Sequence, residues 1–145
     1  MRSSDRSTEI AEAAISFMDK GVVGFDIAGP EIDFPPRIHR QAFEIAHRNN
    51  LPITIHAGEA AGPEYIEEAL TICHASRIGH GTSVREKILD NGQAITSYGI
   101  ATELVERGIA LEVCPTSNIH TGIADSLHSH PVNTCLLYTS DAADE

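Results

Sequence analysis

Apolar residues along the chain follow two spacings, one typical of amphipathic helices and one typical of short buried strands. Helical spacing predicts helices over residues 8–19, 36–49 and 63–73, and two further helical stretches near 83–90 and 95–107. Short apolar runs bounded by glycine or proline predict strands over residues 22–28, 51–59, 76–81 and 108–115. Strands that alternate with helices and are apolar on both faces predict an α/β fold with a parallel sheet covered by helices.

Each predicted strand ends in a polar or glycine-rich cluster. The clusters read DIAGPE at 26–31, HAGE at 56–59, GHG at 79–81 and CPTSN at 114–118. The carboxyl ends of parallel strands lie on one side of a sheet or barrel, and ligands bind on that side. We therefore expect the four clusters to converge on one site.

Two histidines, His56 and His80, terminate buried strands, and Glu59 follows His56 by one tight turn. Gly58 allows the chain to curl so that the carboxylate faces the same pocket. A neutral imidazole is a common metal ligand and also a base near neutral pH. The spacing differs from the helical H-E-x-x-H of metalloproteases and from the H-x-E with P-C-x-x-C of cytidine-type deaminases.

Every one of these features also has a purely structural interpretation, which the sequence leaves open. His56 and Glu59 could be a hydrogen-bonded pair, GHG a simple turn, and CPTSN a helix cap in which Pro115 starts the helix. Cys114 is expected to be a small buried apolar residue. The remaining histidines on helix faces or loops are expected to be solvated: His39, His47, His74 and His120.

Composition narrows the class of protein. The chain has 145 residues and a formal net charge of −11, which disfavours nucleic acid and anionic lipid as partners. No apolar stretch approaches the roughly 20 residues that cross a bilayer, and the N-terminus lacks the apolar core of a signal peptide. Three cysteines without C-x-x-C spacing suggest neither a disulfide framework nor a zinc knuckle. A soluble, cytoplasmic protein is expected.

The last residues do not continue the pattern. The stretch CLLYTSDAADE has no residues placed as a helix cap or a turn would need them. Residues 135–145 are therefore interpreted as a non-native or disordered tail, with an ordinary frayed C-terminus as the alternative.

The four clusters, read as DIAGPE, ITIHAGEAAGPE, RIGHGTSV and LEVCPTSN in this order, resemble the adenosine deaminases. The resemblance covers roughly residues 20–133, including the HPVN run. It implies a partial (β/α)₈ TIM barrel of about four βα units over residues 1–134, because a whole barrel typically needs about 250 residues.

The resemblance also implies roles. His56 would be a zinc ligand, Glu59 would protonate the purine ring at N1, and His80 would orient and deprotonate the zinc-bound water. Gly29 would offer its backbone amide to the purine. The implied reaction of the parent protein is zinc-dependent hydrolysis of adenosine to inosine and ammonia, with a small-molecule purine nucleoside as partner. Alternatives are another aminopurine deaminase acting on adenine or aminofutalosine, a related barrel hydrolase, or a non-catalytic truncated product.

Three departures from the family pattern matter. The first-strand H-x-H pair, which supplies two more zinc ligands in the family, is not in its expected place. The late Asp-Asp pair, which supplies the last ligand and a substrate contact, would lie just beyond HPVN, where the unusual tail begins, and AGPE replaces AGDE after the first strand. His128 and His130 form an H-x-H, but they follow the fourth strand and are not expected to bind metal. This chain by itself is therefore expected to bind zinc poorly and to be inactive.

Overall fold

A computed structural model describes residues 6–90, 95–97 and 99–132. Its helices are α1 (Ser7–Ser16), α2 (Arg40–Arg48), α3 (Pro63–Thr71), α4 (Ile100–Glu106) and α5 (Pro115–His120). Its strands are β1 (Phe25–Ile27), β2 (Ile53–Ala57), β3 (Arg77–His80), β4 (Ile88–Asp90), β5 (Ile95–Ser97) and β6 (Ala110–Glu112). Short 3₁₀ helices are η1 (Met18–Lys20), η2 (Pro36–His39) and η3 (Thr82–Lys87).

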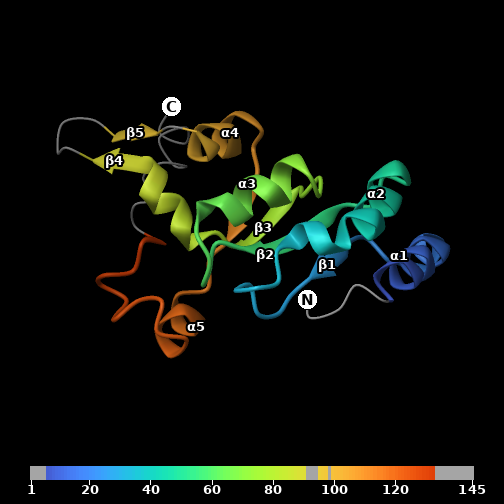
Figure 1. The fold of residues 1–145 in the computed structure, drawn as a ribbon, viewed down its shortest axis with the longest axis horizontal. Helices are drawn as coiled ribbons and strands as arrows, with labels where there is room; N and C mark the ends of the chain where they lie inside the picture. Colours follow the sequence, from blue (N-terminus) through green and yellow to red (C-terminus); the bar gives the residue numbers. More distant parts are fainter. Residues whose placement is uncertain (1–5, 91–94, 98, 133–145) are drawn as a thin grey trace.

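Four of the strands form one parallel sheet in the order β1-β2-β3-β6 (Figure 1). Helix α2 connects β1 to β2, α3 connects β2 to β3, and α4 precedes β6. Both α2 and α3 contact β2, and α1 packs on α2. This order of successive parallel strands joined by helices confirms the predicted α/β class.

The alternation of side chains along β2 separates the core from the prospective site. Ile53, Ile55 and Ala57 are buried, with Ile55 and Ala57 fully so, whereas Thr54 and His56 are partly exposed. Successive side chains of a strand point to opposite faces. His56 therefore lies on the face opposite the one that carries Ile55.

Two of the predicted helical stretches are confirmed only in part. Residues 83–90 form η3 followed by β4, and the stretch 95–107 begins as β5, with helix α4 starting only at Ile100. Strands β4 and β5 pair antiparallel, with Ile88 opposite Ser97 and Asp90 opposite Ile95. Ile88, Ile95 and Thr96 are β-branched, and such residues favour a strand over a helix where a partner strand is present.

Three residues are found in environments other than those expected from the sequence. His39 is 3% exposed, and its Nδ1 lies 2.6 Å from Oγ of Ser7, the first residue of α1. His74 is partly buried and stacks on the His47 ring, with centroids 4.1 Å apart. Cys114 is exposed rather than buried, because it follows β6, one of the two edge strands of the described four-stranded sheet. His47 and His120 are exposed, as expected.

The proposed tail at 135–145 lies outside the described residues. Within the described ranges, the longest helices are too short to cross a membrane.

Candidate functional site

The structure brings together His56, Glu59 and His80 at the carboxyl ends of β2 and β3. The His56 and His80 rings meet edge to face, with centroids 4.8 Å apart and an interplanar angle of 77°. His80 Nδ1 lies 3.4 Å from Glu59 Oε1. His80 is buried and Glu59 is mostly buried, so the two polar groups interact where water screens them little.

Strand register and two glycines place His56 and Glu59. His56 is opposite Gly79 in the β2–β3 ladder, and a Cβ at position 79 would lie 2.7 Å from Cδ2 of His56. Only the absence of a side chain at Gly79 leaves room for the ring. Gly58 has a φ of +74°, and a Cβ there would lie 2.5 Å from Ser83 Oγ. This left-handed turn, which favours glycine, lets Glu59 turn back toward His80.

The loop after β3 is fastened to the loop after β2. The backbone N–H of Gly81 donates to the carbonyl of Ala57 at 3.1 Å, and that of Ser83 donates to the carbonyl of Gly58 at 2.9 Å. The Thr82 hydroxyl donates to the same Gly58 carbonyl at 2.9 Å. His80 has a φ of +64°, which is uncommon for a residue with a side chain. These bonds hold the His80 backbone in its unusual conformation.

A buried carboxylate, Glu31, supports the Glu59 loop from the other side. Glu31 is 3% exposed, and its oxygens accept hydrogen bonds from the backbone N–H groups of Glu59, Ala60 and Ala61 at 2.9–3.1 Å. Glu31 belongs to the AGPE sequence in which Gly29, exposed and with a φ of +132°, makes the turn. The first and second strand-end clusters are thus joined through Glu31.

The fourth cluster reaches the same place through Asn118 on α5. Asn118 Nδ2 lies 3.0 Å from Glu59 Oε1 and 3.2 Å from His80 Nδ1, and its side chain is fully buried. The hydroxyl of Thr121 is 3.4 Å from the same Glu59 oxygen. CPTSN therefore does begin a helix at Pro115, and it also supplies a polar contact to the site.

Sequence reasoning did not single out Glu31 or Asn118, and it noted His130 only as part of an H-x-H pair that is not expected to bind metal. Glu31 and Asn118 are the last residues of two strand-end clusters, so their position was the available signal. His130 carried no such signal, because it lies in a polar loop twelve residues after Asn118 and contacts it only in the folded chain.

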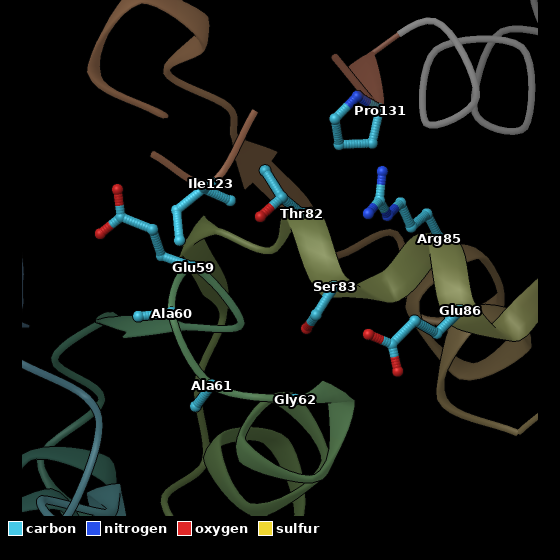
Figure 2. Close-up of a pocket in the computed structure, with 10 residues that line it drawn as sticks. All are labelled: Glu59, Ala60, Ala61, Gly62, Thr82, Ser83, Arg85, Glu86, Ile123 and Pro131. Atoms are coloured by element: carbon cyan, nitrogen blue, oxygen red, sulfur yellow. The ribbon is translucent and has the colours of Figure 1, made fainter. Parts of the chain in front are cut away.

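A small cavity of about 190 Å³ lies between the Glu59–Gly62 loop and η3 (Figure 2). Ser83 and Arg85 from η3 face it, and Ile123 and Pro131 close one side. Ligand pockets are usually about 300–1,000 Å³. The cavity is thus too small to enclose a nucleoside, and neither His56 nor His80 lines it.

The described residues do not complete a metal site. No group of three or more His, Cys, Asp or Glu side chains in the described ranges could hold a metal ion. His56 alone offers an imidazole in the position that the sequence predicts for a ligand. His130 has both ring nitrogens in hydrogen bonds, to Asn118 and to the Val132 backbone, and His128 is exposed.

Comparison with known proteins shows the family. The family model described as adenosine deaminase matches residues 1–139. An adenosine deaminase from Mycobacterium leprae is 49% identical over 132 residues, which cover 90% of this chain and 36% of the relative. The chain thus spans little more than a third of the curated relatives that it matches.

Solved structures agree with the predicted fold. The adenine deaminase from Arthrobacter aurescens superimposes with a TM-score of 0.77 at 29% identity, covering 94% of this chain and 38% of that one. Arabidopsis ADAL complexed with IMP gives a TM-score of 0.74 at 27% identity, covering 94% and 36%. The fold is confirmed as α/β, about four βα units of a (β/α)₈ barrel. From the family match and the relatives together, the chain belongs to the adenosine deaminase family.

Proposed function

We propose that the full-length protein containing this chain hydrolyses adenosine to inosine and ammonia with zinc as its metal, as a soluble cytoplasmic enzyme. One observation carries the proposal. His56, Glu59 and His80 meet at the carboxyl ends of two adjacent parallel strands, in a chain of the adenosine deaminase family. The barrel segment is proposed to extend over residues 1–134.

The contacts of Glu59 suit it to donate a proton to the purine. Asn118, His80 and Thr121 all approach Oε1, and in the described part of the chain no hydrogen bond engages Oε2. Protonation of the ring at N1 draws electrons from C6 and makes that carbon electrophilic. We assign this role to Glu59, with Oε2 as the oxygen that carries the proton.

His80 and Gly29 take the other roles. His80 lies beside Glu59 and edge-on to His56, where an imidazole can orient an attacking water toward C6 and stabilise the charge that develops. The exposed Gly29 amide would bind the purine ring. A zinc ion, when bound, supplies a nucleophile at neutral pH by lowering the pKa of water to about 7. His56 would be one ligand, and the others must lie outside the described residues.

A second candidate is a related aminopurine deaminase. The structural likeness to an adenine deaminase and to ADAL complexed with IMP supports adenine and purine nucleotides as alternative candidate substrates to adenosine. Aminofutalosine is a further candidate substrate of this second kind. A third possibility is that the chain exists only as a non-catalytic truncated product.

These candidates separate when the chain is tested alone and in a complete barrel. The complete barrel is a chimera in which this chain replaces the matching segment of the M. leprae relative. With zinc present, we expect ammonia release from adenosine to exceed that from adenine, AMP and aminofutalosine, and the 145-residue chain alone to release none. Higher activity on adenine or AMP would favour the second candidate, and an inactive complete barrel would contradict the proposal.

The role of Glu59 is tested in the same barrel by Glu59→Gln, which keeps the side-chain shape but cannot donate an acidic proton. Loss of a general acid typically lowers the rate about 10²–10⁴-fold. Glu12→Gln is the matched control, because Glu12 is exposed on α1. Equal activity of the two variants would show that Glu59 is not the general acid.

A further inference from the structure

Asn118 is the centre of a buried hydrogen-bond network that joins three separate segments. Its Nδ2 lies near Glu59 Oε1 and His80 Nδ1, at 3.0 and 3.2 Å. Its Oδ1 lies 3.0 Å from His130 Nε2. Asn118 is fully buried, and His80 and His130 are 6% and 3% exposed, so water cannot replace these contacts.

A single backbone group sets the direction of every bond in the network. The N–H of Val132 donates to His130 Nδ1 at 2.9 Å, and a backbone N–H can only donate. His130 Nδ1 therefore accepts, and the ring carries its proton on Nε2. Burial, together with the positive charge of Arg85, lowers the pKa of His130 and so favours this neutral ring.

The proton on His130 Nε2 in turn fixes the Asn118 amide. That proton is donated to Asn118 Oδ1, because the opposite orientation would set an N–H group against the NH₂ group. The NH₂ group then faces the site, and its two hydrogens are available to Glu59 Oε1 and His80 Nδ1. His80 Nδ1 consequently accepts, which leaves the proton of a neutral His80 on Nε2. In this form the ring can donate to an attacking water and orient it, but it cannot take the proton of that water, contrary to the base role that the family resemblance implies.

We propose that Asn118 and His130 are positioning residues that hold the Glu59 carboxylate and the His80 ring together, and that they fix His80 in its Nε2–H tautomer. His130 touches neither Glu59 nor His80 in the described contacts and acts through Asn118. The consequence for catalysis rests on the proposed function, whereas the tautomers are a property of the folded chain.

The tautomers can be measured without activity, in nitrogen–proton correlation spectra of the full 145-residue chain. We expect His80 and His130 to be Nε2–H tautomers. His130→Leu should let the Asn118 amide turn and make His80 a mixture, while His130→Gln, which keeps a donor near the Nε2 position, should restore the single form. His120→Leu, at an exposed position on α5, is the matched control and should change nothing at His80.

The inference fails if His80 is an Nδ1–H tautomer, or if its tautomer is the same in His130→Leu as in the unaltered chain. It fails equally if both histidines exchange freely between tautomers, as they would in an unfolded peptide. Melting curves show whether each variant is folded. Asn118→Leu, which removes the amide itself, should reproduce the His80 mixture seen in His130→Leu.

Kinetics in the complete barrel test the catalytic consequence. His130→Leu should lower kcat by about tenfold, the effect of roughly one lost hydrogen bond, with KM nearly unchanged. His130→Gln should recover most of that loss. An equal fall in both variants, or a change confined to KM, would contradict a positioning role. An inactive unaltered barrel would instead refute the proposed function and leave the tautomer result to decide the inference.

Discussion

His56 and Gly79 lie opposite each other on β2 and β3, and the His56 ring occupies the space that a side chain at position 79 would need. Cδ2 of His56 would be 2.7 Å from a Cβ at that position. Gly79 has no left-handed φ, so a larger residue would meet a steric obstacle there and no backbone strain. The GHG cluster thus contains a glycine that serves the histidine of the neighbouring strand.

Gly79→Ala should therefore destabilise the chain and displace His56. Overpacking of this kind costs about 1–3 kcal/mol. Gly24→Ala is the matched control, because a Cβ there would make an ordinary 3.5 Å contact with the Pro52 carbonyl. Urea unfolding measures both variants, and we expect the control to stay within about 0.5 kcal/mol of the unaltered chain. Equal stabilities would show that His56 moves aside at no cost.

Glu31→Gln tests the carboxylate that supports the Glu59 loop. The amide keeps one acceptor oxygen, which can take the Oε2 place shared by Glu59, Ala60 and Ala61, but its NH₂ group would then face the Glu59 N–H that now donates to Oε1. Hydrogen bonds to a charged group contribute about 1.5–3 kcal/mol each, and one remaining oxygen cannot replace both. We expect the free energy of unfolding to fall by about 2 kcal/mol.

The exposed Glu12→Gln on α1 is the control for Glu31→Gln, and it should leave the free energy of unfolding nearly unchanged. Amide exchange of Ala60 and Ala61 should accelerate only in Glu31→Gln, because the charged oxygen that both N–H groups share is replaced by a neutral amide group. Unchanged exchange at both positions would contradict the supporting role of Glu31.

The sequence predicts well those parts of the fold in which the spacing of apolar residues and the residue composition favour the same element. The prediction of a helix over residues 63–73 is confirmed by α3 (Pro63–Thr71), because Pro63 suits a first turn and Ile66, Ala69 and Leu70 form one buried face. Residues 95–97 show the opposite case, where helical spacing competes with β-branched composition and pairing with β4 decides. Local pattern cannot report that pairing.

The candidate site divides in the same way. His56, Glu59 and His80 are visible in the sequence because they stand where buried strands end. Asn118 contacts Glu59 and His130 only in the folded chain. These residues lie far apart in loops and a short helix, where the sequence has no periodic pattern from which the contacts could be predicted. Cys114 was wrongly expected to be buried, because the sequence does not show that β6 forms an edge of the described four-stranded sheet.

Acid should destabilise the chain through two histidines. Burial is the main cause that lowers the pKa of both His74 and His130 below the ordinary value of 6.5, with neighbouring positive charges from His47 and Arg85 adding to it. The unfolded chain then binds more protons than the folded one as the pH falls. The stability from these neutral rings is complete above pH 6.5 or so and decreases below it.

Urea unfolding at several values between about pH 7.5 and pH 5.5 measures this loss. His130→Gln does not titrate at this position and should flatten the decline, leaving the part that belongs to His74. His120→Gln, at an exposed position, should follow the unaltered chain. A decline as steep in His130→Gln as in the unaltered chain would exclude His130 as a source.

The two cysteines in the described ranges should differ sharply in reactivity. Burial, with Glu68 adding negative charge, raises the pKa of Cys73 to about 12, and the side chain is fully buried. The thiolate is the reactive form, so Cys73 should resist iodoacetamide near neutral pH, whereas the exposed Cys114 should be alkylated. Mass mapping of the peptides distinguishes the two sites. In urea both should react, and equal labelling of the folded chain would show that Cys73 is not protected by burial.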